Sequence, residues 1–493
     1  MNKPNILLIM TDQHRLSALK AYDKHTVCQT PNIDRLAAQG VLFENTYTTC
    51  PVCTPARASV LTGEYPHKHG MKMNRDCHTL AAQRVRSRQD TLAHRLKKQG
   101  YRCGYNGKWH LGDRDLHITP DVTLPSHLPS DSGFEGYDYP GHGDGGQIFD
   151  DYKEYLRDNG WTDEVIHDVE IPTTSLPRWG RLAGPTESCI PYYITTHTIE
   201  MIDRFQAQDE PWFMWHNFWG PHEPHYVSKE YLDMYRDVSI APWPNFELDT
   251  IDMDLPQAAK RHPEYERMKW EYYEELVRHY YAFTTMIDAQ IGRLMDHLHE
   301  TGLGDNTVIM FTADHGETLG SHAGLGDKGW HHFEEIQRIP FIARLPQAYY
   351  RGDVQPGHRL DQLMSLADVF PSILDLAGEE REQIGAQGES FIALVEKEDS
   401  LWRDCVVTQF WGLGNVPTNM LSIRYKGYKY GWNGAGGNEL YDLTNDPYEL
   451  KNIIGLAEFH EIKQMMRDKL LDWMDENDMQ PRGFKHYFTM TSR

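Results

Sequence analysis

The sequence predicts an α/β fold: a large domain with a mostly parallel sheet flanked by helices, and a smaller C-terminal α+β domain with an antiparallel sheet. The large domain is predicted because short apolar runs alternate with amphipathic helical stretches, as in doubly wound sheets. The small domain is predicted because closely spaced strand candidates replace that alternation after about residue 385. At roughly 100–200 residues per domain, 493 residues suffice for two or more domains. We expect residues 1–385 to form the first and residues 386–493 the second.

The strands of the large domain are expected at four apolar runs. These runs cover residues 5–10 (NILLIM), 101–105, 212–218 (WFMWHNF) and 307–312 (TVIMFT). Runs of this length that are apolar throughout, rather than alternating, suit strands buried on both faces, as in a parallel sheet.

Two helices are expected between these strands. Residues 91–99 end at Gly100, and glycine commonly terminates a helix. Residues 270–299 carry apolar side chains at steps of three and four, which trace one helix face, and Gly302 follows them.

The C-terminal domain is expected to be a small sheet followed by a helix. The helix is predicted at 462–475, and the linker to the large domain at 379–388 (EEREQIGAQG). The strand candidates are residues 406–411, 420–425, 428–432 and 440–441.

Composition and charge exclude two classes of partner. Acidic residues outnumber basic ones by 72 to 49, so the formal net charge is −23. Nucleic-acid binders usually carry the opposite sign, and an anionic membrane surface is also an unfavourable partner. No segment reaches 18 consecutive apolar residues, so no membrane span is expected.

The N-terminus predicts a buried first strand rather than a secretion signal. Its apolar run, residues 6–10, is short, meets Asp12 at once and lacks a small-residue cleavage site. We therefore expect a cytoplasmic protein. The seven cysteines, an odd number spread over a long chain, do not form the pattern of a disulfide framework.

Polar residues follow each of the four predicted strands. Because ligands of open parallel sheets bind beyond the carboxyl ends of the strands, we expect these side chains to converge at one edge. They are Asp12, Lys108, His110, His222, Asp314 and His315.

Three of these residues are natural ligands for a metal ion. The carboxylates of Asp12 and Asp314 favour a hard divalent cation, and the nitrogen of His315 admits manganese as well as calcium or magnesium. Asp12 taken alone could equally cap a turn, because aspartate is common in turns.

The strongest local signal is the segment CPVCTPARASVLTG, residues 50–63. Pro55 is favourable in the first turn of a helix, so Cys53 is expected at a helix N-terminus. Free N–H groups and the helix dipole there suit an anion, or an oxyanion that forms during a reaction. Cys50 and Cys53 could instead form a C-x-x-C redox pair, but the first cysteine of such a pair lies just ahead of its helix, whereas Cys50 lies further upstream.

These segments, taken together, make the chain resemble the sulfatase family of the alkaline-phosphatase-like superfamily. CTPAR (53–57) followed by LTG (61–63) is similar to the signature in which the family's cysteine is oxidised to formylglycine. Other segments match in the right order and cover most of the chain: NILLIMTDQ (5–13), GYNGKWHLG (104–112), WGPH (219–222), ADHGE (313–317), Lys328 and LYDLTNDPYELKN (440–452).

The resemblance implies an alkaline-phosphatase-like fold and the hydrolysis of sulfate monoesters. Cys53, converted to formylglycine by a maturation enzyme, would hydrate to a diol beside one divalent metal ion. One hydroxyl would attack sulfur and displace the alcohol, and the other would let the sulfate leave as the aldehyde re-forms.

The resemblance also implies roles for five basic residues. Arg57 would hold the diol, while Lys108 and Lys328 would neutralise the sulfate oxygens. His110 would deprotonate the diol, and His222 would protonate the leaving alcohol.

The first metal loop departs from the pattern of many sulfatases. Gln13 stands where a second aspartate would be, and Asp314–His315 replaces the Asp–Asn pair of some members. This pattern resembles choline sulfatases and phosphonate monoester hydrolases. With one carboxylate fewer, calcium stays the first expectation, manganese becomes credible and magnesium is a further alternative. The implied ligands are Asp12, Gln13, Cys53, Asp314 and His315.

Two further functions stay open. One is a phosphonate monoester or phosphodiester hydrolase that uses the same groups, and the other is a non-catalytic binder of sulfated sugars with an unmodified Cys53. The expected substrate is a small anionic sulfate ester, and no oligomeric state follows from the sequence. The glycine-rich segment 141–146 (GHGDGG) is interpreted as a pocket loop. Candidate pocket-lining residues are His14, His216, His225, His331 and His332.

Overall fold

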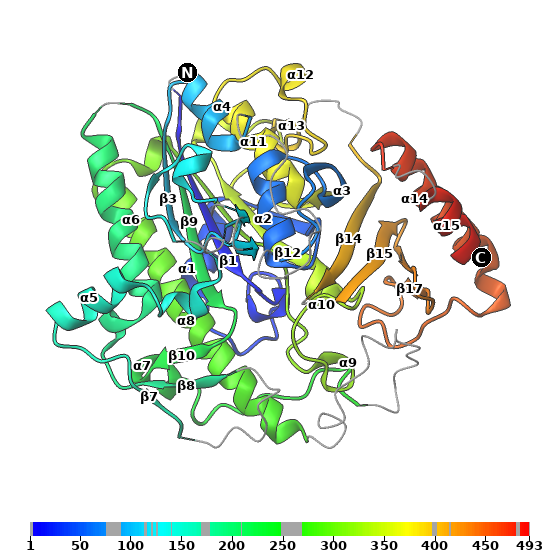
Figure 1. Ribbon diagram of the computed structural model, residues 1–493, viewed down its shortest axis with the longest axis horizontal. Coiled ribbons are helices and arrows are strands. Elements are labelled where there is room, and N and C mark those ends of the chain that lie inside the picture. Colours follow the sequence, from blue (N-terminus) through cyan, green and yellow to red (C-terminus); the bar gives the residue numbers. More distant parts are fainter. Residues whose placement is uncertain are drawn as a thin grey trace.

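The computed structural model describes residues 3–74, 90–112, 116–119, 122–124, 127–139, 141–168, 178–208, 210–247, 269–396, 402–413, 416–479 and 484–492. They form one large sheet with helices on both faces and a smaller sheet beside it, next to the C-terminal helices (Figure 1). Among these residues, no helix combines the length and the apolar character needed to cross a lipid bilayer.

The large sheet has eight strands and is mostly parallel. Only β12 runs antiparallel to its neighbours β11 and β2, while the other neighbouring pairs are parallel. The predicted class of a mostly parallel α/β sheet is therefore confirmed. In spatial order the strands are β13 (Arg359–Ser365), β2 (Val41–Tyr47), β12 (Arg338–Arg344), β11 (Thr307–Ala313), β1 (Asn5–Asp12), β9 (Trp212–Pro221), β3 (Arg102–Gly107) and β6 (Glu135–Gly136).

Helices cover both faces of this sheet, as the apolar strands require. Along β1, Leu7 and Ile9 pack into one core, whereas Ile6, Leu8 and Met10 pack into the core on the opposite face. All five side chains are fully buried. The first core lies under α1 (Pro31–Gln39), α6 (Ile190–Gln206) and α8 (Trp270–Glu300), and the second under α2 (Cys53–Thr62), α4 (Leu92–Lys98) and α11 (Val369–Leu376).

The C-terminal part is a four-stranded antiparallel sheet with a helix packed on it, as predicted. Met466, Leu470 and Met474 of the helix are buried against Leu421 and Trp432 of the sheet. The elements are β14 (Cys405–Leu413), β15 (Val416–Tyr425), β16 (Tyr428–Asn433), β17 (Glu439–Asp442), α14 (His460–Glu476) and α15 (Phe484–Thr491).

The remaining elements are short. A three-stranded sheet and a two-stranded hairpin join brief helices around the large sheet. They are β8 (Trp179–Leu182), β10 (His225–Ser228), β7 (Val165–Ile166), β4 (Leu116–Thr119), β5 (Val122–Leu124), α3 (Pro66–His69), α5 (Asp150–Asp158), α7 (Lys229–Asp233), α9 (Ser321–Gly324), α10 (Glu334–Gln337), α12 (Arg381–Ile384) and α13 (Ile392–Val395).

The segment predicted as a linker is packed rather than extended. It contains α12, and its Ile384 is buried in the core under α2 and α11. The two sheets also contact each other directly. The backbone N–H of Gln409 in β14 donates to Thr49 O at 2.9 Å, and Thr408 Oγ1 donates to Thr48 O at 2.7 Å. The small sheet therefore lies against the loop that leads into α2.

Candidate active site

Two neighbouring strands deliver the acidic residues to one point. In the parallel register of β1 and β11, Thr11 lies opposite Ala313. Asp12 and Asp314 are the next residues along each strand, so their carboxylates leave the sheet side by side. Both side chains are completely buried. Asp314 is held in place by backbone donors, because its Oδ1 accepts from the N–H of Gln13 at 3.0 Å and of His315 at 2.9 Å.

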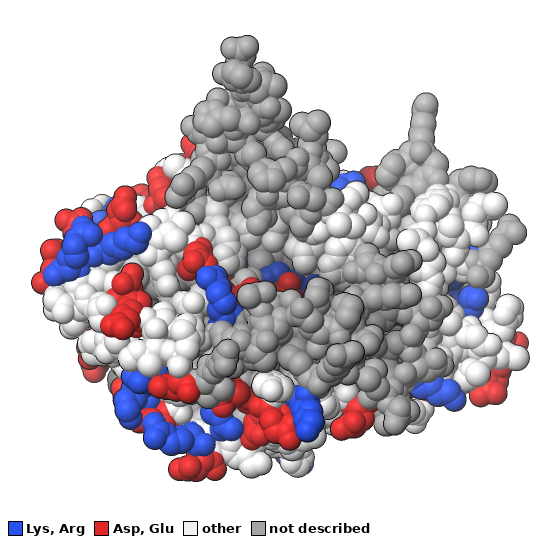
Figure 2. All heavy atoms as spheres, turned by 60° about the horizontal axis from the view of Figure 1, so that its bottom comes forward, with Lys and Arg blue, Asp and Glu red and all other residues white. Residues whose placement is uncertain are grey.

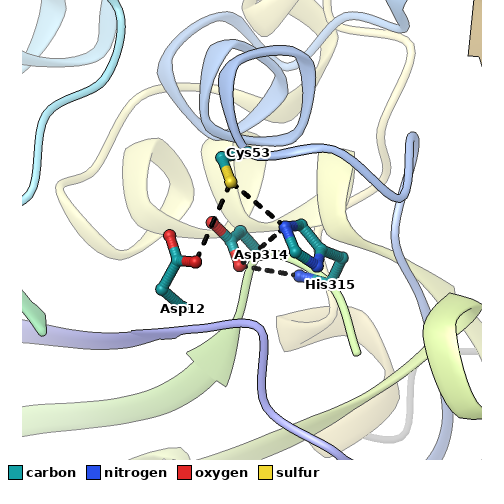
Figure 3. A group of neighbouring side chains, drawn as sticks. All are labelled: Asp12, Cys53, Asp314 and His315. Carbon is teal, nitrogen blue, oxygen red and sulfur yellow. Dashed lines mark hydrogen bonds and ion pairs between the residues drawn. The ribbon is translucent and has the colours of Figure 1, made fainter. Parts of the chain in front are cut away.

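Cys53 joins these carboxylates from the other side. It is the first residue of α2, as predicted, and its side chain points toward Asp12, Asp314 and His315 (Figure 3). Its Sγ lies 3.8 Å from Asp12 Oδ1 and 3.3 Å from His315 Nε2. One ligand atom from each of the four residues lies within 4.8 Å of the others. Residues that are 302 positions apart in the chain thus form one compact, buried cluster.

This donor set fits a divalent cation. Two carboxylates and an imidazole are ligands of calcium, magnesium and manganese sites, and burial lowers the pKa of His315, which favours the neutral, ligating form. Burial alone would raise the pKa of Asp12, but the positive charges around it, led by Lys108, hold it well below its ordinary value. Both groups are therefore in the protonation states that metal binding needs.

Arg57 links the two carboxylates across the cluster. Its Nη2 donates to Asp12 Oδ2 at 2.9 Å and its Nε to Asp314 Oδ2 at 3.0 Å. Its Nη1 donates to Lys108 O at 2.9 Å and to Asn217 Oδ1 at 3.0 Å. Arg57 is 1% exposed, so its charge is fully satisfied by these acceptors. It follows Cys53 by one helical turn, as the spacing predicts.

Lys108 follows β3 and places its ammonium beside both the cluster and Cys53. Its Nζ lies 2.6 Å from Asp12 Oδ2 and 3.6 Å from Cys53 Sγ. Even so, burial and the neighbouring Asp12 raise the pKa of the Cys53 thiol to about 12. The unmodified thiol is thus protonated near neutral pH and is a poor nucleophile or redox group.

Gln13 and Lys328 border the cluster on the side of the loop after β11. The Nζ of Lys328 donates to Gln13 Oε1 and lies 3.5 Å from Asp327 Oδ1. Although burial opposes its charge, Cys53 and Asp327 raise the pKa of Lys328. Gln13 has a φ of 57°, a left-handed conformation that an asparagine or glycine would adopt more readily.

Three histidine rings pack together near the cluster. The ring of His142 packs edge-on against His110 and His222, with centroid distances of 5.3 and 4.6 Å. Burial and then the charge of Lys108 hold the pKa of His110 well below its ordinary value. Burial and then the charge of Lys328 do the same for His222. The 141–146 segment therefore contributes a side chain to the site, in agreement with its interpretation as a pocket loop.

Comparisons with known proteins identify the family of the chain. Residues 4–379 match the model of the sulfatase family, and residues 320–476 match the model of the C-terminal part of N-sulphoglucosamine sulphohydrolase. The chain belongs to the sulfatase family. It is a hydrolase of sulfuric esters.

Three relatives illustrate the range of this sulfatase's neighbours. The ulvan-active sulfatase of Formosa agariphila is 28% identical over 98% of this chain and 84% of its own length. The choline-sulfatase of Rhizobium meliloti is 27% identical over 92% of this chain and 82% of its own. The crystal structure of the phosphonate monoester hydrolase of Agrobacterium radiobacter superposes with a TM-score of 0.73 at 25% identity, covering 96% of both chains.

The other histidines considered from the sequence lie in different surroundings. The ring of His14 packs on Phe311 and contacts Thr11 Oγ1. His216 contacts Thr198. His225 packs on Tyr280, His331 on Phe333, and His332 contacts Asn433. All five side chains are buried.

Three residues of the site were not assigned from the sequence. Asn217 interrupts the apolar run of β9 and binds Arg57. His142 lies within the glycine-rich segment 141–146, which was interpreted as a pocket loop without a role for this side chain. Glu317 stands in the ADHGE segment, only three residues after Asp314, and its side chain accepts from Gln13 Nε2. Two signals could have found two of them: Asn217 is polar within a mostly apolar strand, and Glu317 stands in the matched ADHGE segment.

Over the described part of the face in Figure 2, basic and acidic side chains are interspersed. The charge of −23 therefore does not produce a uniformly acidic face there. The positive charges of Arg57, Lys108 and Lys328, all buried at the cluster, supply the local field that an anionic ester requires.

Proposed function

We propose that this sulfatase hydrolyses sulfate monoesters with Cys53 converted to formylglycine and with one divalent cation bound. The observation that carries the proposal is the cluster of Asp12, Cys53, Asp314 and His315, whose ligand atoms lie within 4.8 Å of one another. These four residues and Gln13 would hold the ion. Calcium is the first expectation, with manganese and magnesium as alternatives.

When bound, the cation would polarise sulfate oxygens and make the converted side chain of Cys53 a better nucleophile. The chain's own residues bind and orient the ester. Lys108 Nζ, 3.6 Å from Cys53 Sγ, and the buried Lys328 offer ammonium groups to the sulfate oxygens. Arg57 fixes the two carboxylates, which keeps the acidic ligands in place while charge develops on the sulfate.

The two histidines divide the proton transfers. One hydroxyl of the hydrated formylglycine loses its proton to water and forms a bond to sulfur as the S–O bond to the alcohol breaks, and His222 gives the leaving oxygen a proton. His110 then removes a proton from the second hydroxyl, the C–O bond to sulfate breaks, and the aldehyde is restored. The packing of the His142 ring against both His110 and His222 supports this division, because it brings the two proposed proton-transfer groups close together.

Mass spectrometry of the peptide that contains Cys53 tests the conversion directly. We expect a mass lower by about that of one water, restored on hydration, when the protein is produced with a formylglycine-generating enzyme. An unconverted peptide in an active preparation would contradict the proposal. Activity on a panel of sugar, aryl, choline and lipid sulfates would then define the alcohol.

A phosphonate monoester or phosphodiester hydrolase is the second candidate. Gln13 and the Asp314–His315 pair favour it, together with the superposition on the phosphonate monoester hydrolase of Agrobacterium radiobacter. Comparing kcat/KM for an aryl sulfate and an aryl phosphonate monoester with the same leaving group separates the two. A larger value for the phosphonate would make the second candidate the main activity.

A further inference from the structure

We propose that Glu317 is a positioning residue that turns the side-chain oxygen of Gln13 toward the cation site. This inference rests on the proposed function, because it concerns how the chain prepares Gln13 to act as a ligand. Glu317 does not itself belong to the ligand cluster.

The Gln13 amide has two acceptors beside its nitrogen and a donor beside its oxygen. Its Nε2 donates to Glu317 Oε2 and, at 3.1 Å, to Asp327 Oδ1. Its Oε1 accepts from Lys328 Nζ, which lies at the cluster. Because carboxylates can only accept, two of them beside one end of the amide fix that end as the NH₂ group.

The backbone of Gln13 is fixed independently. Its N–H donates to Asp314 Oδ1 at 3.0 Å, and its carbonyl oxygen accepts from Tyr280 at 2.8 Å. The left-handed φ of 57° also restricts this residue. With the main chain held at both ends, the orientation of the amide depends on what the side chain contacts.

Glu317 is anchored strongly enough to impose that orientation. Its Oε1 accepts from the backbone N–H groups of Leu319 and Asp327, both at 2.8 Å, and from Thr318 Oγ1 at 3.3 Å. The residue is 4% exposed. Burial and the charge of Asp327 raise its pKa, yet each of these partners is a donor, as an acceptor carboxylate requires. Three contacts on Oε1 leave Oε2 for Gln13.

The consequence concerns the affinity for the cation. A hard cation needs an oxygen, and an amide turned by half a rotation would present its NH₂ group instead. Partners that orient ligand side chains typically contribute about 10- to 100-fold to metal affinity. Glu317 would orient the amide of Gln13, which is neutral and is therefore not oriented by a charge of its own.

A double-mutant cycle tests the proposal. Glu317→Gln keeps the shape but places an amide against the NH₂ of Gln13, and we expect Ca²⁺ and Mn²⁺ to bind about 10- to 100-fold more weakly. Gln13→Glu alone places a second carboxylate beside that of Glu317, and the two repel each other. In the Gln13→Glu background, Glu317→Gln restores a donor–acceptor pair and should strengthen binding. The effect of Glu317→Gln should therefore reverse its sign between the two backgrounds.

The measurement is calorimetric titration of chelator-stripped protein with Ca²⁺ and Mn²⁺, using preparations with equal conversion of Cys53. The metal-free melting temperature is recorded alongside, because a merely structural role for Glu317 would lower it equally in both backgrounds. Asp296→Asn is the matched control. The Asp296 side chain is 56% exposed and pairs with Arg35, and we expect its loss to change affinity by less than about 3-fold.

The outcomes are distinguishable. In one outcome, the wild-type protein binds the metal while Glu317→Gln causes the same loss of affinity in both backgrounds, or no loss in either. That result would overturn the positioning role and leave the proposed function intact. A chain that binds neither ion in calorimetry would overturn both.

Discussion

Nζ of Lys328 lies 2.5 Å from Nε2 of His222, and this contact determines where the histidine carries its proton. The other ring nitrogen, Nδ1, lies 2.7 Å from the carbonyl oxygen of Glu223, which can only accept. Nδ1 therefore holds the proton, and Nε2 faces the lysine as an acceptor. Since an acid must present a proton to the leaving alcohol, His222 can act only when Lys328 turns toward the sulfate and Nε2 gains a proton.

Lys328→Met should shift the pH dependence of the reaction to higher pH. After burial, the charge of Lys328 is the main cause that lowers the pKa of His222, so removing it raises that pKa. The protonated, acid form then persists to higher pH, and the limb along which activity falls with rising pH moves upward. The overall rate also decreases, because a sulfate-binding cation is lost. The shape of the kcat/KM profile on an alkyl sulfate measures the shift.

The exposed Lys98, whose side chain is 68% accessible, provides the control for that experiment. Lys98→Met should leave the profile unchanged. A falling limb that stays in place or moves to lower pH in Lys328→Met would show that Lys328 does not control the proton of His222.

His222→Ala should affect poor leaving groups more than activated ones. An alkyl alkoxide needs a proton as it leaves, whereas an activated aryl oxide does not, and general acid catalysis contributes typically about 10²- to 10⁴-fold. We therefore expect kcat/KM to fall by about that factor for alkyl sulfates and far less for a nitrophenyl sulfate. Equal losses on both substrates would remove His222 from the acid role, and His142, 4.6 Å away between ring centroids, would be tested next.

Arg57→Met should destabilise the metal-free protein and lose activity. The two carboxylates that Arg57 links are completely buried, and removing the partner of a buried charge costs about 3–5 kcal/mol. Added Ca²⁺ or Mn²⁺ should recover part of this loss, because a cation neutralises the same two groups. Arg57→Lys keeps a charge but cannot reach all four acceptors, so it should be more stable than Arg57→Met and still poorly active. Denaturant unfolding with and without metal measures both effects.

The sequence predicted the strands that carry the site more completely than the strands that surround it. β1, β9, β11 and β3 are buried on both faces, so apolar residues dominate them, although polar residues interrupt β3 and, at Asn217, β9. β13, β2 and β12, at one side of the sheet, and the short β6 at the other were not predicted. The sequences of β2 (VLFENTY) and β13 (RLDQLMS) both contain polar residues, because part of each strand is partly exposed. Neither strand therefore shows a clear apolar run.

The site residues were predictable where they follow a strand or open a helix. Asp12 ends β1, Asp314 and Lys108 come directly after β11 and β3, and Cys53 opens α2. The contacts of Glu317 and His142 were not predictable, because each lies in a loop whose path no periodic pattern specifies. The loop 317–328 includes Leu319, His322 and Ala323 at positive φ, and irregular contacts such as those of Glu317 with the backbone at 319 and 327 help to hold it.

Cys53→Ala should abolish turnover, whereas Cys50→Ser should retain it. Cys53 is the residue proposed to become the nucleophile, while Cys50 packs with Val52, Phe410 and Met420 in a small apolar cluster. Burial raises the pKa of Cys50 well above its ordinary value, which leaves it an unreactive thiol. Circular dichroism should show both variants folded. Loss of activity in Cys50→Ser, with formylglycine present at position 53, would revive the redox interpretation.

The contact between the two sheets should depend on one buried ion pair. Arg403, just before β14, donates from Nη1 and Nη2 to Asp368 at 2.6 and 2.7 Å, and Asp368 is completely buried. Arg403→Met would leave that carboxylate without its cation, so we expect a loss of about 3–5 kcal/mol in the free energy of unfolding. Arg35 and Asp296 form a comparable pair at 2.8 Å, but their side chains are 38% and 56% exposed, so Arg35→Met should cost no more than about 1 kcal/mol. Urea denaturation of both variants measures the difference. Similar losses in the two would show that burial of the Arg403–Asp368 pair does not strengthen the junction.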